Sequence, residues 1–121
     1  MVKGYEASSG AIERAQANAV LNGLASRCEF RIADLYDPGY ELPADAQQLL
    51  LDPPRSGAGP HLATWLRASA LQRVAYVSCN PVTFASDAAI FESEGFTLSE
   101  VGIFDMFPHT AHVETLGVFV R

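Results

Sequence analysis

The apolar residues of this sequence recur at two spacings, one typical of helices and one typical of strands. Windows with apolar residues three or four positions apart predict helices at 9–22, at 61–70 and from Pro81 to a stop at Gly95. Runs that are apolar throughout, or apolar at every second position, predict strands at 2–6, 28–34, 47–52, 75–79, 96–107 and 112–120. Strands and helices that alternate in this way predict an α/β fold with a mostly parallel sheet.

Residues that begin or end elements support these boundaries. Ser8 or Ser9 can cap the first helix, and Asn22-Gly23 can end it. Pro53-Pro54 must end the strand before it, because neither proline donates a backbone hydrogen bond. The link that contains Pro108 is short, and a link that short suits an antiparallel pair. We therefore expect the final strand to be antiparallel.

The composition is that of a folded, reduced protein. The chain has 121 residues, 49% of them hydrophobic, which is enough for one domain over residues 1–121. No apolar stretch reaches the roughly eighteen residues that span a bilayer, and the N-terminus lacks a signal-peptide pattern. We therefore expect a cytoplasmic protein, without membrane partners, in which Cys28 and Cys79 are free thiols.

The charge argues against nucleic-acid binding by this surface alone. The formal net charge is −6 and the sequence pI is about 4.8. Binding to phosphates needs clustered Lys and Arg side chains, which such a balance does not favour. Any affinity for nucleic acid would need a basic surface from elsewhere.

Three acidic residues lie at or just after the predicted carboxyl ends of successive strands. They are Glu6, Asp34 and Asp52, and this spacing puts them on one rim of a parallel sheet. In dinucleotide-type folds, an acid in such a place hydrogen-bonds ribose hydroxyls, so Glu6 suits a nucleoside-containing cofactor. The alternative is that each acid only caps a helix or starts a loop.

Cys79 ends a predicted buried strand, at the edge where open α/β sheets bind their ligands. Asn80 and a helix N-terminus follow it, and the dipole of that helix would favour a thiolate. The alternative is an inert core cysteine, and we interpret Cys28 in that way. The spacing of the cysteines and histidines gives no zinc pattern, so we expect no metal site.

The segment Phe107-Pro-His-Thr-Ala-His-Val-Glu114 places two histidines and a carboxylate within a few residues. Such a cluster can supply a general base if it folds against the cysteine. A solvated or structural His-x-Glu pair is the alternative.

Three strings, in this order, carry a resemblance to one family. They are Leu51-Asp-Pro-Pro-Arg-Ser-Gly57, Ser78-Cys-Asn-Pro-Val-Thr83 with Asp87, and Asp105-Met-Phe-Pro-His-Thr-Ala-His-Val-Glu114. From about Glu6 to its end, the chain resembles the C-terminal part of the RNA uracil-5-methyltransferases, which modify tRNA and ribosomal RNA with S-adenosylmethionine. The resemblance implies a Rossmann-like methyltransferase fold, and it favours a catalytic role for Cys79 over a structural one.

The resemblance also implies roles for single residues. Cys79 would attack C6 of the target uracil, so that C5 takes the methyl group, and Glu114 would then remove the C5 proton. The cofactor-binding residues implied by the family are Glu6 for the ribose, Asp34 near the adenine, and Asp52. The residues expected to contact the target nucleotide are Arg55, Asn80 and His112.

The chain departs from the family before Val2. Members carry a first strand with a glycine-rich cofactor loop there, and an N-terminal RNA-binding β-barrel, some with an iron–sulfur cluster. We therefore expect a catalytic segment of a larger enzyme, in which the barrel supplies the RNA-binding charge. A sheet without its central strand would expose an apolar gap, so we also expect this chain to self-associate.

Two other functions remain open at this point. The Asp52-Pro-Pro string could serve methylation of an exocyclic amine, which needs no thiol. The chain could also be a non-catalytic α/β module that folds and associates without further activity.

Overall fold

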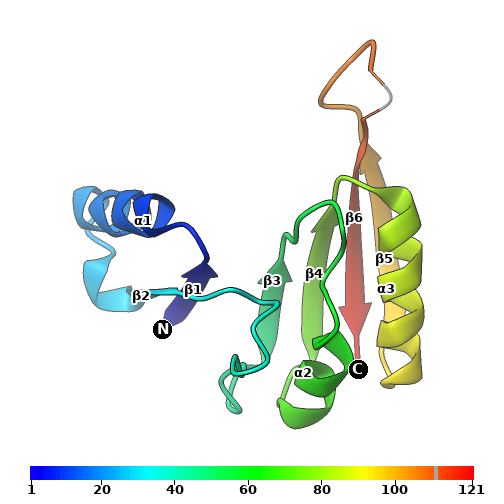
Figure 1. Ribbon diagram of the computed structural model, residues 1–121, viewed down its shortest axis with the longest axis horizontal. Coiled ribbons are helices and arrows are strands. Elements are labelled where there is room, and N and C mark those ends of the chain that lie inside the picture. Colours follow the sequence, from blue (N-terminus) through cyan, green and yellow to red (C-terminus); the bar gives the residue numbers. More distant parts are fainter. Residues whose placement is uncertain (111) are drawn as a thin grey trace. The chain divides into compact units, whose positions relative to one another are not determined.

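The computed structural model describes residues 1–110 and 112–121, and its ribbon follows the chain through two units, Met1–Tyr40 and Glu41–Arg121 (Figure 1). Each unit has its own sheet. Among the described residues, no helix is long and apolar enough to cross a membrane.

The first unit is a strand, a helix and a second strand. Its elements are β1 (Val2–Glu6), α1 (Ser9–Leu21), the short 3₁₀ helix η1 (Ala25–Arg27) and β2 (Cys28–Ile32). The strands are parallel, with Gly4 opposite Phe30. Ser8 caps α1 as expected, because its Oγ accepts a hydrogen bond from the Ala11 N–H over 3.3 Å. Gly23 follows the helix with a φ of 67°, the left-handed conformation that commonly ends helices.

The second unit holds the larger sheet. Its elements are β3 (Gln48–Leu51), α2 (Leu62–Ala68), β4 (Arg73–Ser78), α3 (Pro81–Ser93), β5 (Thr97–Phe104) and β6 (Glu114–Val120). The strand order is β3-β4-β6-β5, and Figure 1 shows the four strands side by side. β3 and β4 are parallel, and β6 is antiparallel to both β4 and β5. The expected antiparallel final strand is confirmed, although it lies inside the sheet rather than at its edge.

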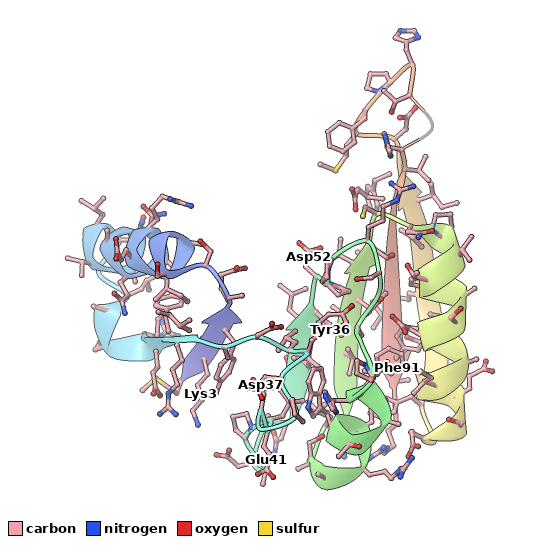
Figure 2. All side chains as sticks on the ribbon, viewed as in Figure 1. Lys3, Tyr36, Asp37, Glu41, Asp52 and Phe91 are labelled. Atoms are coloured by element: carbon pink, nitrogen blue, oxygen red, sulfur yellow. The ribbon has the colours of Figure 1, made fainter. Side chains whose placement is uncertain are left out.

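One face of this sheet is buried beneath α2 and α3, which lie on the same side of it in Figure 1. Burial alternates strictly along β4 and β6, as expected for strands with one covered face. The core beneath α3 is aromatic: Phe91, labelled in Figure 2, stacks on Phe119 with ring centroids 4.2 Å apart, and Tyr76 and Phe96 meet Phe91 edge to face. Aromatic pairs of this kind stabilise a core by about 0.5–1.5 kcal/mol each beyond the burial of their area.

The other face of the same sheet is only half covered. Ala75, Val77, Leu116 and Val118 are half-buried there, and Leu50 of the edge strand is 72% exposed. The two faces therefore differ sharply, and the side chains discussed next lie at the carboxyl end of this open face.

The predicted elements all form, and their boundaries shift by a few residues. The strand predicted at 96–107 ends at Phe104, and the strand predicted at 112–120 begins at Glu114. Strand 75–79 begins earlier, at Arg73, and ends at Ser78, so Cys79 lies one residue beyond the strand.

Candidate active site

The register of the central strands brings Cys79 and Glu114 to the same level of the sheet. β4 pairs with β6 up to Ser78, which lies opposite Thr115. The next residue on one side is Cys79 and on the antiparallel side is Glu114, so the two come level. Glu114 in turn lies opposite Phe104 of β5. A thiol, a carboxyl group and an aromatic ring therefore come from three neighbouring strands.

These side chains line a hollow of about 370 Å³. Asp52, which follows β3 and is labelled at the end of that strand in Figure 2, lines it as well. The rest of the lining comes from the end of β4, the segment after β5 and the start of β6: Val77, Met106, Thr115 and Leu116. A mostly apolar hollow with a few polar groups is the usual form of a site for a small organic group.

Cys79 is held between a strand and the start of a helix. Asn80 caps α3, since its Oδ1 accepts from the Val82 N–H over 3.0 Å, and Pro81 begins the helix without needing a hydrogen-bond acceptor. The Cys79 side chain is half-buried. The backbone at Cys79 is therefore held in place, and its side chain lines the hollow.

Hydrogen bonds from α3 hold the loop that follows Asp52. The Arg55 carbonyl accepts from Asn80 Nδ2 and from Thr83 Oγ1, each over 3.2 Å. One turn further along, Asp87 Oδ2 accepts from the Ala58 N–H over 2.8 Å. The loop is therefore hydrogen-bonded to the first two turns of α3, the helix after Cys79.

Asp87 is the buried residue among these hydrogen-bonding groups of α3. Its Oδ2 also accepts a hydrogen bond from the Tyr76 hydroxyl in the core. Gly57 comes so close that a Cβ there would lie 2.9 Å from the same oxygen, and its φ of 93° is one that residues with side chains rarely adopt. A glycine at this place allows the loop to pass directly over Asp87.

Arg55 and His112 contact each other at the surface. Arg55 Nη1 lies 3.2 Å from His112 Nδ1. A guanidinium group only donates hydrogen bonds, so Nδ1 accepts and the proton of the neutral ring lies on Nε2. The contact joins the loop after β3 to the segment before β6, on which Thr110 Oγ1 also accepts from the His112 N–H.

Glu6 and Asp34 lie in the first unit, at the carboxyl ends of its two parallel strands. The ladder continues one step past β2, because the Ala33 N–H donates to the Glu6 carbonyl over 3.1 Å. Glu6 Oε1 accepts from the Ser8 N–H, and Asp34 Oδ1 accepts from the Tyr36 N–H, each over 2.9 Å. Both carboxyl groups are exposed and fixed in direction by these turns.

The sequence prediction names three polar members of the hollow and misses the other residues that line it. Asp52, Cys79 and Glu114 come together, whereas Phe104 and Met106 were not singled out. The role of Asp87 in holding the loop was missed too. The available signal was the Phe-x-Met string formed by Phe104 and Met106. Its relation to Glu114 depends on the strand register, which places Phe104 opposite Glu114.

Comparison with known proteins shows the family of the chain. Residues 11–121 match the family described as tRNA (uracil-5-)-methyltransferase. The chain belongs to this family. The resemblance read from the three sequence strings is thereby confirmed.

Two similar curated proteins carry the same name. A relative from Hahella chejuensis, named 23S rRNA (uracil(1939)-C(5))-methyltransferase RlmD, is 45% identical over 99% of this chain. A protein of the same name from Stenotrophomonas maltophilia is 48% identical over 99% of the chain. In both comparisons the chain spans 28% of the relative, so it corresponds to somewhat more than a quarter of those proteins.

Solved structures agree on the fold. The Pyrococcus abyssi tRNA (uracil-54, C5)-methyltransferase in complex with S-adenosyl-L-homocysteine matches 98% of this chain with a TM-score of 0.83 and 34% identity, over 28% of its own length. A geranyl diphosphate methyltransferase in complex with SAM matches with a TM-score of 0.65 at 10% identity, over 99% of this chain and 68% of its own, which shows a shared fold alone. The expected Rossmann-like methyltransferase fold is confirmed.

Proposed function

We propose that this chain supplies the catalytic residues of an S-adenosylmethionine-dependent enzyme that methylates C5 of a uridine in tRNA or ribosomal RNA. One observation carries the proposal: Asp52, Cys79 and Glu114 line a single hollow beside the ends of β3 and β4. A family member needs a nucleophile and a base within reach of one pyrimidine, and this hollow offers both.

Cys79 acts as the nucleophile. C5 of uracil reacts poorly with an electrophile until a neighbouring carbon has been attacked. The Cys79 thiolate adds to C6, and the C5–C6 π electrons move toward C5 and the O4 carbonyl. C5 then forms its bond to the methyl carbon while the bond from that carbon to the sulfonium sulfur breaks, which would leave S-adenosylhomocysteine as the second product. The position of Cys79 beside Glu114 in the register supports this assignment.

Glu114 acts as the base that completes the reaction. After methylation, C5 still carries its proton, and the C6–S bond cannot break until that proton leaves. The Glu114 carboxylate accepts the proton, the C5=C6 double bond re-forms, and the thiolate leaves as Cys79 is restored. The half-buried position of Glu114, opposite Phe104 and level with Cys79, suits a group that acts on one bound base.

The residues at the strand ends fit the proposed cofactor. S-adenosylmethionine, when bound, supplies the methyl group from a sulfonium and carries ribose hydroxyls and an adenine amino group. Glu6 and Asp34 present exposed carboxylates, which accept hydrogen bonds from such hydroxyl and amino groups. Asp52 presents a third carboxylate, and it does so at the hollow itself.

Arg55, Asn80 and His112 are the proposed contacts of the target nucleotide. The Arg55 and His112 side chains are exposed and contact each other. The guanidinium group of Arg55 offers several N–H donors in one plane, and the imidazole of His112 offers its Nε2–H. Asn80 differs, because both ends of its amide already bond within the chain. We propose that Asn80 serves the nucleotide by holding the Arg55 loop in place.

RNA and the cytoplasm are the proposed partner and location. The described relatives are named for rRNA and tRNA substrates, and the chain itself carries a net charge of −6. An acidic segment of this kind gains little from phosphate contacts, so we propose that basic surface elsewhere in the functional enzyme holds the RNA. The target base must be turned out of any stack to reach Cys79.

A trapping experiment in the full-length protein tests the proposal. RNA that contains 5-fluorouridine has fluorine where Glu114 would find a proton, so the adduct with Cys79 cannot collapse and stays attached in denaturing gels. We expect the adduct in the wild type and in the control Cys28→Ala, and none in Cys79→Ala. An adduct that survives in Cys79→Ala would show that another residue is the nucleophile.

The second step has its own variant. Glu114→Gln keeps the shape of the side chain but cannot take up the proton, so we expect a methylated adduct to accumulate with ordinary uridine RNA. Rapid turnover by Glu114→Gln would remove Glu114 from the mechanism. Full methylation by Cys79→Ala would instead favour transfer to an exocyclic amine through the Asp52 motif.

A further inference from the structure

Phe104 and Met106 are large apolar side chains that this protein leaves exposed. Phe104 is 49% exposed and Met106 is 64% exposed, although both line the hollow that contains Cys79. Phe104 takes no part in the aromatic core, whose rings lie on the opposite face of the sheet. Exposed apolar groups beside polar ones are typical of a binding surface rather than of a core.

The backbone sets the direction of the Phe104 ring. Phe104 lies opposite Glu114, and cross-strand partners project from the same face of a sheet. The ring also covers Gly102, because a Cβ at that glycine would lie 3.3 Å from a ring carbon of Phe104. The ring therefore lies against the open face of the sheet, next to the carboxyl group proposed as the base.

We propose that Phe104, assisted by Met106, is the surface on which the target uracil stacks during the reaction. The inference rests on the proposed uridine chemistry and adds the contact that selects and orients a flat base. A nucleobase has two apolar faces and a polar edge, and a protein that holds an unstacked base commonly places an aromatic ring on one face.

The lining of the hollow matches such a ligand. Val77, Leu116, Phe104 and Met106 provide apolar area, and Asp52, Cys79 and Glu114 provide polar groups in the same lining. A base on Phe104 would meet apolar atoms with its face and the polar groups with its edge. A phosphate gains nothing from a phenyl ring, and a flat base covers more of that ring than a ribose does, so a base is the part of a nucleotide that best fits this surface.

The chain offers a matched control on the same strand. Ile103 is 72% exposed, more than Phe104, and its cross-strand partner Thr115 belongs to the covered face. Successive residues on a strand point to opposite faces, so Ile103 projects away from the face that carries Phe104. A substitution there changes exposed apolar area on β5 without touching the proposed stacking surface.

Kinetics with the full-length protein test the inference. Phe104→Ser removes the ring, and we expect KM for a uridine-containing RNA to rise roughly 5- to 150-fold, the range that loss of one stacked base gives. Phe104→Tyr keeps a flat ring and should restore KM to within about threefold of wild type. Ile103→Ser should leave KM unchanged.

A fluorescence signal reports stacking directly. In a Cys79→Ala background, which blocks chemistry, the indole introduced by Phe104→Trp should be quenched when a uridine-containing RNA binds. The same RNA should not quench the indole introduced by Ile103→Trp. Quenching at both positions, or at neither, would overturn the inference.

The outcomes separate this inference from the proposed function. If wild-type protein forms no adduct with 5-fluorouridine RNA, the uridine chemistry itself fails. If the wild type forms the adduct and Phe104→Ser forms it at the same rate and KM, the chemistry stands and the stacking role is wrong.

Discussion

The two units of this chain differ in how much of their apolar surface they bury. Glu41–Arg121 encloses an aromatic core in which Tyr76, Phe91 and Phe119 are fully buried. Met1–Tyr40 buries only Ile12 and Ala19 among its described hydrophobic side chains. A two-stranded sheet with one helix has too little area to form a core of that kind.

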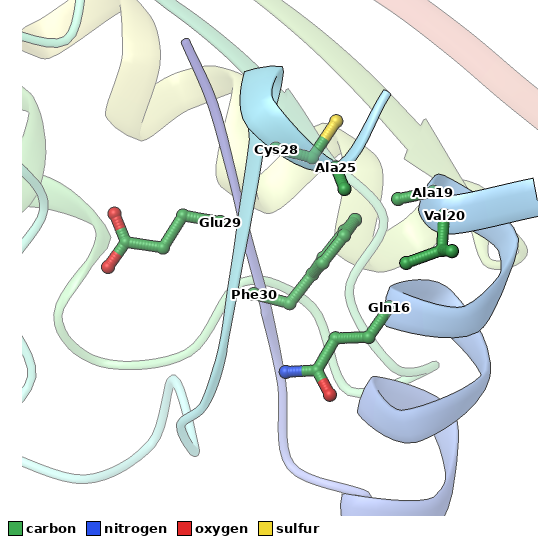
Figure 3. Close-up of a pocket in the computed structure, with 7 residues that line it drawn as sticks. All are labelled: Gln16, Ala19, Val20, Ala25, Cys28, Glu29 and Phe30. Atoms are coloured by element: carbon green, nitrogen blue, oxygen red, sulfur yellow. The ribbon is translucent and has the colours of Figure 1, made fainter. Parts of the chain in front are cut away.

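The first unit also contains a gap between its helix and its sheet. Figure 3 shows Phe30 of β2 directed toward Ala19 and Val20 of α1 across this hollow, while Glu29 points away from it. The hollow is about 370 Å³ in volume. The difference between the units teaches that the proposed nucleophile and base stand on the stable part of the chain, whereas the proposed nucleoside contacts Glu6 and Asp34 stand on the weaker part.

Hydrogen exchange should give the largest contrast between the units. Backbone amides in the middle of β4 and β6 should exchange at least about 100-fold more slowly than those of β1 and β2, because local opening costs less where little area is buried. Exchange monitored by mass spectrometry or NMR measures this ratio. Equal protection in both pairs of strands would show that the units unfold as one.

Core truncations should lower the free energy of unfolding more in the second unit than in the first. Phe119→Ala should lower the free energy of unfolding by about 3–5 kcal/mol, because the ring is fully buried against Phe91. Ile12→Ala should cost about 2 kcal/mol or less, since Ala19 is the other buried hydrophobic side chain among the described residues of its unit and little packing is lost. Urea unfolding followed by circular dichroism checks both, and a larger loss for Ile12→Ala would reverse the ranking.

Two glycines with similar backbone angles should respond differently to alanine. Gly57→Ala places a Cβ 2.9 Å from Asp87 in a buried loop, whereas Gly23→Ala meets nothing within 4 Å. Each substitution puts an alanine in the left-handed conformation, which costs about 1–2 kcal/mol of stability. Only Gly57→Ala must also shift the loop. We therefore expect a larger fall in Tm for Gly57→Ala, and a fall in methylation in that variant alone.

The smallest effect should come from surface ion pairs. Arg67 holds Glu94 through two hydrogen bonds of 2.8 and 2.9 Å, and these lower the pKa of Glu94 while burial opposes the shift. A lowered folded pKa means that the contribution to stability is present above the carboxyl's ordinary pKa and disappears as pH falls through the folded value.

Glu94→Gln should therefore lower Tm slightly at pH 7 and leave it unchanged near pH 2. The comparison in the first unit is the Arg31–Glu29 pair, in which both side chains are more exposed than Glu94. Glu29→Gln should leave Tm unchanged at either pH. A larger effect of Glu29→Gln would contradict the ranking of the two units.

Local signals in the sequence were enough to predict the elements, and long-range pairing was not visible in them. The capping residues Ser8 and Asn80 and the glycines Gly23 and Gly95 act within a few residues, so their helices are predicted closely. Asp52, Cys79 and Glu114 could be named because each follows or begins a strand. Their meeting in one hollow depends on the order β3-β4-β6-β5, which no local pattern encodes.

The roles of single polar residues were harder to predict for the same reason. Asn80 reads as a group free to contact a ligand, yet its amide is used by Val82 and by the Arg55 carbonyl, a partner far away in sequence. Asp87 was named only as part of the second family string, yet it is buried under Gly57 and holds the loop. A carboxyl or amide group finds such partners only when the loop closes on the helix.

The irregularity in the β5–β6 pairing decides on which side of the sheet Phe104 stands. Leu98 pairs with Phe119 and Glu100 pairs with Val118, so Ser99 is an extra residue in β5. Counting by twos from Leu98 would put Phe104 on the helix-covered side, and the extra residue reverses the parity. Removal of Ser99 would therefore exchange the sides of Ile103 and Phe104, so the length of this strand is constrained as tightly as the identity of its residues.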